Sequence, residues 1–234
     1  MKKLVFLTGA GVSAESGFST FRDAGGLWEQ HPVEEVCTCE GWMRNPTRVN
    51  NFYNGLREQL IAAKPNAAHE HIAALEADFD VTVITQNVDD LHERAGSSRV
   101  VYLHGELMKA CSSRDKENPF CLKTLSREHL RIDEGERAAD GSLLRPYIVF
   151  FGEAVPRLEE AARIVEEADI FVIVGSSLVV YPAAGLLYNV RPGVPIYLID
   201  PKDVEVPSAM AVTVIQDVAT RGMARLAALL KAEA

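Results

Sequence analysis

Long apolar runs are missing from this sequence of 234 residues, and none approaches the length of a transmembrane helix. The start, Met1-Lys2-Lys3 and then apolar residues, superficially imitates a secretory signal. Only Leu4–Leu7 is strongly apolar, however, before Thr8 and a glycine intervene. We therefore expect a cytoplasmic protein without a membrane partner.

An excess of basic residues is also missing, because the formal net charge is −9. This charge argues against a nucleic-acid-binding surface and is compatible with a protein that receives cationic, lysine-bearing peptides. The hydrophobic share of 47% is ample for a core. We expect a monomer with one domain, or with one domain that carries a smaller inserted lobe.

Cysteine is scarce, with only Cys37, Cys39, Cys111 and Cys121. The pair Cys37-x-Cys39 is too close for an ordinary redox C-x-x-C motif. In a cytoplasmic chain these thiols are expected to be reduced, and the sequence assigns no role to the pair.

A glycine turn follows the first apolar run. Leu4–Leu7 predicts a parallel strand buried on both faces, and Thr8-Gly9-Ala10-Gly11 ends it. Its two glycines allow close backbone approach to a ligand, and Ser13–Ser16 offers a helix start whose free N–H groups favour a phosphate. With Ala14 in the third position, the turn fits a dinucleotide fingerprint, although any α/β domain can carry a glycine turn.

Polar residues follow the next two predicted strands. Gln86 and Asn87 come after the strand 81–85 and could orient a ribose or a water, while Asp89 could accept a hydrogen bond from a carboxamide or hydroxyl. A turn that caps a helix near Asp90 is the alternative. His104 follows the strand 100–103 and could take a proton from a sugar hydroxyl near neutral pH, although a lone histidine is more often structural.

Helical spacing marks residues 49–60 and 67–77, and the first of these predicts an inserted helical lobe. His69 and His71 lie two positions apart on the second helix and so face different sides, which argues against a shared metal. Buried strands are predicted at 170–174 and 195–200, with a last strand or turn at 214–218 and an amphipathic helix at 223–231.

Five motifs occur in the order and spacing of one family, and together they cover nearly the whole chain. They are GAGVSAESGFSTFRDAGGLW (9–28), TQNVD (85–89), LHGEL (103–107), LRPYIVFFGE (144–153) and VGSSL (174–178). In these motifs the chain resembles the sirtuins, the NAD-dependent protein deacylases. The resemblance implies transfer of ADP-ribose from NAD to the acyl-lysine oxygen, release of nicotinamide, and formation of O-acyl-ADP-ribose.

The resemblance also implies a fold and its division. We expect an α/β fold, a Rossmann-like parallel sheet with a helical insertion and a second small, zinc-free insertion. The Rossmann-like core would span about 1–28, 78–107 and 144–234, the helical insertion about 29–77, and the reduced small lobe about 108–143.

Site residues are implied position by position. His104 would be the general base, and Asn87 would position the ribose and a water. The NAD-binding residues would be Gly9, Ala10, Gly11, Ala14, Glu15, Thr20, Phe21, Arg22, Trp28, Gln86, Asn87, Asp89, Gly175, Ser176, Ser177, Leu198, Ile199, Asp200 and Val218. The acyl-lysine substrate would meet Tyr53, Arg57, Ile148, Val149, Phe150, Phe151 and Gly152.

Two departures from the family pattern stand out. Most sirtuins carry two C-x-x-C pairs for zinc in the region 108–143, where this chain has only Cys111 and Cys121. Adding His129 and Asp133 gives C-x9-C-x7-H-x3-D, which matches no familiar zinc spacing, and we predict a metal-free lobe. Leu198 stands where many relatives have Asn, so the side-chain hydrogen bond of those relatives is not expected here.

The preferred acyl group is a further open question. Thr20 and the small residues before Trp28 resemble the desuccinylase-like subgroup, which reads a carboxylated acyl chain with a Tyr-x-x-Arg pair. Here Tyr53 is followed by Leu56 at that spacing, and Arg57 comes one residue later. Because positions i and i+4 also share a helix face, Arg57 could reach the pocket. We favour deacetylation with tolerance of longer acyl chains and keep desuccinylation open.

Two other function classes use the same cofactor. A protein ADP-ribosyltransferase would leave label from NAD on protein. A non-catalytic NAD-sensing module would release no nicotinamide, and the presence of both Asn87 and His104 argues against it. A hydride-transferring dehydrogenase fits the motifs least.

Overall fold

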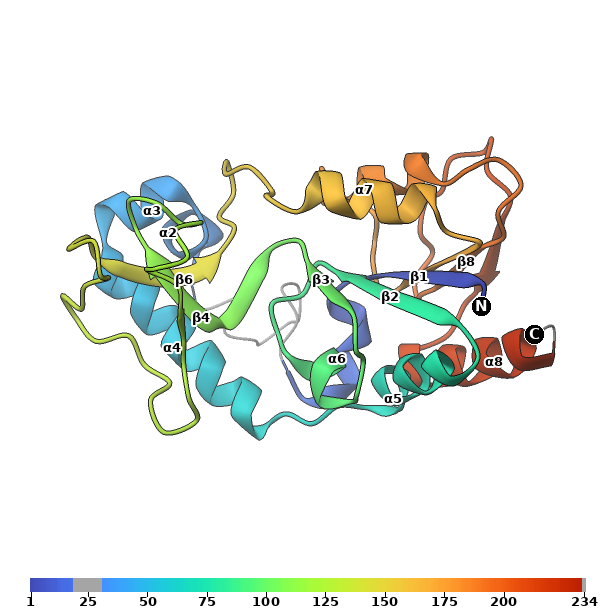
Figure 1. Ribbon diagram of the computed structural model, residues 1–234, viewed down its shortest axis with the longest axis horizontal. Coiled ribbons are helices and arrows are strands. Elements are labelled where there is room, and N and C mark those ends of the chain that lie inside the picture. Colours follow the sequence, from blue (N-terminus) through green and yellow to red (C-terminus); the bar gives the residue numbers. More distant parts are fainter. Residues whose placement is uncertain (19–30, 233–234) are drawn as a thin grey trace.

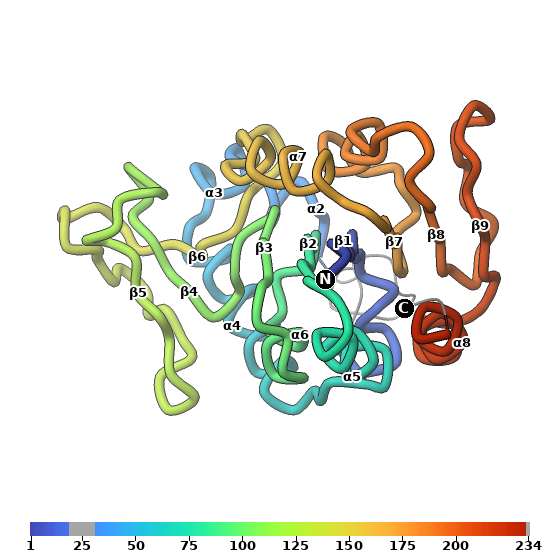
Figure 2. Tube along the Cα trace, turned by 45° about the vertical axis from the view of Figure 1, so that its right-hand side comes forward, coloured from blue at the N-terminus to red at the C-terminus, as the bar shows by residue number. Residues whose placement is uncertain are grey.

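The computed structural model describes residues 1–18 and 31–232. Within these residues the larger sheet has six parallel strands in the order β3-β2-β1-β7-β8-β9 (Figure 2). Their bounds are β1 Lys3–Thr8, β2 Asp80–Thr85, β3 Val100–Tyr102, β7 Ile170–Val174, β8 Ile196–Ile199 and β9 Val212–Ile215. This sheet and the helices around it confirm the predicted α/β fold class.

Helices cover both faces of the sheet, with α7 on one side and α5 and α8 on the other (Figure 1). None of the helices in the described residues has the length and apolar content that crossing a bilayer requires. The bounds are α2 Val33–Val36, α3 Cys39–Arg44, α4 Pro46–Ala62, α5 Ala67–Ala74, α6 Leu91–Arg94, α7 Leu158–Glu166 and α8 Ala219–Ala232, with short 3-10 helices η3 Leu75–Ala77 and η4 Ala183–Asn189.

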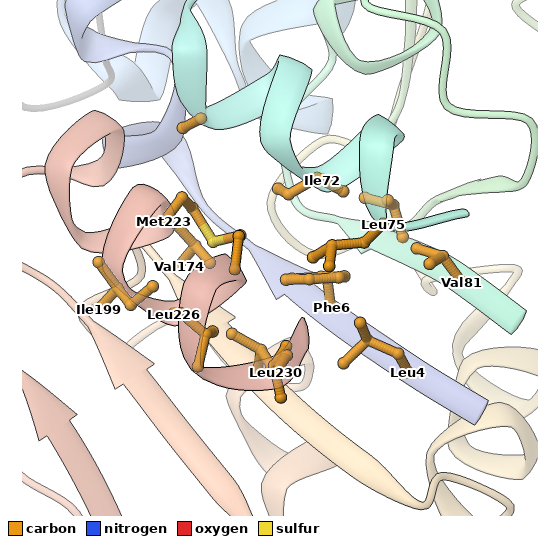
Figure 3. Packing of buried hydrophobic residues seen from close by; sticks show 14 of the residues in the cluster. Leu4, Phe6, Ile72, Leu75, Val81, Val174, Ile199, Met223, Leu226 and Leu230 are labelled. Atoms are coloured by element: carbon orange, nitrogen blue, oxygen red, sulfur yellow. The ribbon is translucent and has the colours of Figure 1, made fainter. Parts of the chain in front are cut away.

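Strand β1 is buried on both faces, which explains its continuous apolar run. Leu4 and Phe6 pack in one cluster with residues of α5 and α8 (Figure 3). Val5 and Leu7 pack in the second cluster, with residues of α7 and η4. Alternate residues of a strand point to opposite faces, so a strand between two helical layers needs apolar residues at every position.

At the predicted helix start, 13–16, the structure has a short 3-10 helix with Ser13 as its N-cap instead of a regular α-helix. Two three-residue 3-10 helices follow the strand, η1 Ala10–Val12 and η2 Ala14–Ser16, and Gly17 ends the second in the left-handed region. Two N–H groups of this segment are used locally, because those of Ser13 and Ser16 donate to Ala10 O and Ser13 O at 3.1 and 3.0 Å. The N–H of Gly11 donates to Gly175 O, directly after β7, at 2.9 Å.

Helix α4, Pro46–Ala62, contains the predicted helix 49–60 and extends it by three residues at its start and two at its end. Asn45 caps it by accepting from the Arg48 N–H, and Pro46 occupies the first turn, where its missing N–H costs nothing. Its apolar face packs in a third cluster with Ile148 and Phe150. The helical segment therefore forms a wall next to the segment predicted to bind acyl-lysine.

A second, antiparallel sheet has the order β5-β4-β6, with β4 Gly105–Ser112, β5 Lys123–Thr124 and β6 Leu144–Ile148. Ser112 Oγ and Ser142 Oγ both donate to the carboxylate of Asp140, at 2.6 and 2.7 Å. These bonds tie the end of β4 to the loop before β6. They cross-link the small lobe in the region 108–143, where the family pattern has its zinc ligands.

The two cysteines of the small lobe, Cys111 and Cys121, do not belong to a group of possible metal ligands within the described residues. Cys111 is buried in β4, where its pKa is raised to about 12 by burial, and Cys121 is buried in a turn. His129 and Asp133 are exposed. Among the residues that the structure describes, no three His, Cys, Asp or Glu side chains lie together so that they could hold a metal ion. The metal-free lobe remains a prediction.

Candidate active site

The chain order of the sheet reverses between β1 and β7, because β2 and β3 lie on one side of β1 and β7, β8 and β9 on the other. Open α/β sheets bind ligands outside the carboxyl ends of the strands at such a point. The segments that follow β1, β2, β3, β7 and β8 begin at Gly9, Gln86, Leu103, Gly175 and Asp200. The segment after β3 ends in His104, and the other four contain predicted NAD-binding residues.

Three glycines bring the ends of β1 and β7 into backbone contact. A Cβ on Gly9 would lie 2.6 Å from Gly175 O, and one on Gly11 would lie 2.7 Å from Gly175 Cα. Gly175 itself has φ +61, and its own Cβ would meet the Val12 N at 2.3 Å. Because any side chain here would displace backbone, the three predicted cofactor glycines are required by the fold itself.

Gln86 crosses from the end of β2 to the end of β7. Its Nε2 donates to Ser176 Oγ at 2.9 Å, and its backbone oxygen is 2.9 Å from His104 Nδ1. A carbonyl oxygen can only accept, so Nδ1 carries the proton and His104 Nε2 is left with its lone pair. Burial lowers the pKa of His104 from its ordinary value, although the bond to Gln86 opposes this shift. His104 is therefore neutral at physiological pH and can accept a proton at Nε2.

Asn87 and Asp89 meet at the hydroxyl of Ser13. Asn87 Nδ2 donates to Ser13 Oγ at 3.1 Å, and Ser13 Oγ donates to Asp89 Oδ2 at 3.0 Å. All three side chains are at least nine-tenths buried. Burial raises the pKa of Asp89 to about 6, against the hydrogen bonds from the Leu91 N–H and Ser13, which lower it. The structure thus brings two predicted site residues together through a serine.

The predicted acyl-lysine segment continues from β6 directly beside His104. The N–H of Val149 donates to His104 O, and the N–H of Phe151 donates to Cys37 O at 2.8 Å. Ile148 and Phe150 are buried, whereas Phe151 and Gly152 are exposed at the surface. The segment therefore lies between the histidine and the helical lobe.

An ion pair supports the end of this segment. Arg145 Nη1 and Nη2 donate to the two carboxylate oxygens of Glu153, at 2.7 and 3.2 Å, and Nη2 also donates to Ile148 O. Glu153 in turn accepts from the Phe150 N–H at 2.8 Å. The guanidinium lies 3.9 Å from the centroid of the Phe150 ring. This bidentate pair fixes the turn that ends the predicted substrate segment.

Tyr53 and Arg57 are both buried, but their polar groups point to different partners. Tyr53 Oη donates to Cys37 Sγ at 3.3 Å. Arg57 Nε donates to Leu107 O at 2.7 Å, and its Nη1 donates to Asn54 Oδ1 at 2.8 Å. Burial lowers the pKa of Arg57 to about 10, so it stays cationic at neutral pH. The structure places Arg57 as a link between α4 and β4.

Several other predicted cofactor residues take structural roles. The Glu15 carboxylate accepts from the N–H and hydroxyl of Thr220 at the start of α8. Leu198 and Ile199 are buried in the two core clusters, so only their main chains can meet a ligand. Ala10 is half-buried and Ala14 is exposed. Thr20, Phe21, Arg22 and Trp28 lie outside the described residues.

The remaining predicted residues line the edge of the sheet. Asp200 follows β8 with its carboxylate accepting from the Lys202 N–H at 2.9 Å. Ser176 is buried and Ser177 exposed after β7, and half-buried Val218 precedes α8. The predicted site residues do not include Ser13, which accepts from Asn87, or His69 and His92, which contact Ser13 and Thr8. Only Ser13, directly after the glycine turn, gave a signal that could have been followed further.

Comparison with known proteins points to one family. A model of the Sir2 family matches residues 9–182. A Bacteroides thetaiotaomicron protein named NAD-dependent protein deacylase is 59% identical over 230 residues, which cover 98% of each chain. A Helicobacter pylori protein with the same name is 52% identical over 202 residues, which cover 86% of each chain.

Solved structures agree with these relatives. A Sir2 homologue in complex with NAD is 37% identical, with a TM-score of 0.87 over 99% of this chain and 90% of that one. A Sir2 structure with the inhibitor EX-527, 2'-O-acetyl-ADP-ribose and a deacetylated p53 peptide is 31% identical, with a TM-score of 0.76 over 97% of this chain and 94% of that one.

Proposed function

The chain belongs to the Sir2 family and is an NAD-dependent protein deacylase, and we propose that it removes neutral acyl groups from lysine, with His104 as general base and Asn87 as the positioning amide. The observation that carries this proposal is the fixed His104 tautomer, with Nδ1 bonded to Gln86 O and Nε2 left as an acceptor. A histidine held in this form beside the substrate segment can take a proton from a sugar hydroxyl.

The residues at the sheet edge fit NAD. This molecule carries a pyrophosphate, two riboses and a carboxamide. The edge offers a backbone turn without Cβ atoms at Gly9 and Gly11, hydroxyls at Ser176 and Ser177, and carboxylates at Asp89 and Asp200. When bound, NAD supplies the ADP-ribosyl group that the acyl oxygen accepts, with nicotinamide as the leaving group. Asn87 would hold the ribose through its amide oxygen, and His104 Nε2 would remove a hydroxyl proton.

The acyl pocket is proposed to be apolar. Tyr53 and Leu56 belong to the same buried cluster as Ile148 and Phe150, with Val88 packed against it. The Tyr53 hydroxyl is committed to Cys37. Arg57 donates to Leu107 O and Asn54 Oδ1. A carboxylate placed against Leu56 would lose its hydration without gaining a cation, which is costly, so neutral acyl chains are favoured.

Peptides with acetyl-, butyryl-, octanoyl- and succinyl-lysine test this proposal, with products read by mass spectrometry with and without NAD. Neutral chains should turn over faster than succinyl. Leu56→Arg, which creates the Tyr-x-x-Arg spacing, should raise succinyl turnover relative to acetyl, because positions i and i+3 share a helix face. Succinyl turnover well above acetyl in the wild type, lost in Arg57→Met but not in Leu56→Ala, would contradict a neutral pocket.

A monomeric state, a cytoplasmic location and the three-part division of the chain are also proposed. All four cysteines are free thiols, which suits a reducing compartment. The division has support in the separate small sheet and in the helices between residues 33 and 62. Sedimentation of the purified protein at micromolar concentration tests the monomer, and a stable dimer would contradict it.

A further inference from the structure

Two histidines are buried behind the site without a part in the chemistry above. His69 on α5 is 0% exposed, and His92 on α6 is 1% exposed. Their rings pack edge to face with centroids 4.8 Å apart. Burial lowers the pKa of His69 to about 4 and that of His92 well below its ordinary value. Both rings are therefore neutral, and each has one N–H donor and one acceptor nitrogen.

The tautomer of His69 follows from its neighbours. The backbone N–H of Asn66 donates to His69 Nδ1 at 3.3 Å, as part of the cap of α5. A nitrogen that accepts carries no proton, so the proton of His69 is on Nε2. This Nε2 lies 3.4 Å from Ser13 Oγ and donates to it.

The direction of the hydrogen bonds at Ser13 fixes the orientation of the Asn87 amide. A hydroxyl has one proton, and Ser13 donates it to Asp89 Oδ2, which also leaves Ser13 able only to accept from Asn87. The amide nitrogen of Asn87 must then face Ser13, and its oxygen Oδ1 is turned the other way. Because the pKa of Asp89 is about 6, the carboxylate is ionised and accepts at pH 7.5.

A second chain reaches the backbone of the same residue. His92 Nε2 lies 3.1 Å from Thr8 Oγ1, and Thr8 Oγ1 donates to Thr85 Oγ1 at 2.9 Å. The N–H of Asn87 donates to the same Thr85 oxygen at 3.0 Å. Since the Thr8 proton is committed to Thr85, His92 donates from Nε2.

We propose that His69 and His92 are positioning residues for Asn87, because their hydrogen-bond chains fix its side-chain amide and its backbone so that Oδ1 is the acceptor available to the ribose. His69 acts through Ser13: a ring that donates to Ser13 forces the serine proton toward Asp89. His92 acts through Thr8 and Thr85. This inference rests on the role proposed for Asn87.

His69→Gln and His69→Leu form a matched pair, because both are near the ring in size but only Gln keeps a donor. At saturating NAD and peptide, His69→Leu should lower kcat about tenfold with the KM for NAD within about twofold, and His69→Gln should recover most of the loss. His71→Ala, on the same helix but outside both chains, should keep wild-type kcat. A His69→Leu protein that melts like the wild type and keeps wild-type kcat overturns the proposal.

A double-mutant cycle separates positioning from general packing. His69→Leu should cost little further kcat in a Ser13→Ala background, whereas a packing role predicts that the two losses multiply. If His69 variants fail to fold, Thr8→Val tests the second chain without removing a ring. It should lower kcat severalfold with little change in melting temperature, and unchanged kcat overturns the role of His92.

Asn87→Ala separates the role proposed for Asn87 from the role proposed for His69 and His92. Wild-type turnover by Asn87→Ala contradicts the proposed role of Asn87 and removes the basis of this inference. Loss of turnover in Asn87→Ala together with multiplying losses in the cycle overturns the inference alone.

Discussion

The backbone N–H of Val149 donates a hydrogen bond to the carbonyl oxygen of His104 at 2.9 Å. The next residue, Gly105, pairs with Ile148 in the small sheet. Only glycine fits there, because φ is +89 and a Cβ would lie 2.1 Å from Tyr147 O. The backbone pairing therefore fixes the position of the proposed base, His104, relative to the proposed substrate segment.

The pH profile should report His104. Burial lowers the folded-state pKa of His104 from its ordinary value near 6.5, so the neutral form persists to lower pH than for an exposed histidine. The acidic limb of kcat/KM for the NAD reaction should therefore have its midpoint below 6.5. A midpoint well above 7 would contradict the neutral buried base.

The Arg145 and Glu153 pair should affect the peptide more than NAD. Glu153→Gln removes the carboxylate that holds Phe150 N–H and leaves a buried guanidinium short of its counter-charge. The KM for acyl-peptide should rise about tenfold while the KM for NAD changes little, and the melting temperature should fall. The exposed pair Arg157–Glu160 at the start of α7 provides the control, and Glu160→Gln should change neither KM. Equal rises of both KM values would refute a local role.

Asp140 should stabilise the small lobe in a pH-dependent way. Hydrogen bonds from Ser112 and Ser142 lower its pKa to about 2, below the unfolded value near 4. Its contribution is therefore present above pH 4 and is lost as the pH falls from about 4 to about 2. Asp140→Asn should melt at a lower temperature than wild type at pH 7, and the gap should narrow below pH 4. The matched control is Asp115→Asn, which changes an exposed acid in the same lobe. An equally large fall in its melting temperature at pH 7 would contradict the stabilising role of Asp140.

Metal content gives a separate check on the small lobe. The purified protein should hold no stoichiometric zinc and should keep its activity in a strong chelator, because a thiolate zinc site needs four ligands. One zinc per chain by elemental analysis would contradict this prediction, and Cys111, Cys121 and His129 would be the first ligands to test.

The strands were predictable because apolar runs such as Leu4–Leu7 must be buried on both faces of a parallel sheet. The position of Asn87 and His104 at strand ends followed from the same rule, since the carboxyl ends of parallel strands share one edge. The positions of these two residues followed from the local sequence and the sheet, whereas their roles followed from the family resemblance.

Contacts between distant segments could not be read in the same way. Ser13 meets His69 across 56 positions in the chain, and no local pattern encodes that contact. Helical spacing placed Arg57 on the face of Tyr53, but the packing of β4 decides that its guanidinium meets Leu107 O. Ser13–Ser16 was predicted as a helix start, and the structure has a 3-10 helix of three residues there, Ala14–Ser16.

The most direct test incubates wild-type, His104→Ala and Asn87→Ala proteins with NAD and an acetyl-lysine peptide, and follows all products by mass spectrometry. The wild type should form nicotinamide, free lysine peptide and O-acetyl-ADP-ribose in equal amounts. Both variants should remain folded and lose deacetylation by about a hundredfold or more, the size expected when a general base is removed. Near wild-type turnover by His104→Ala, or ADP-ribose retained on protein as the main product, would contradict the account.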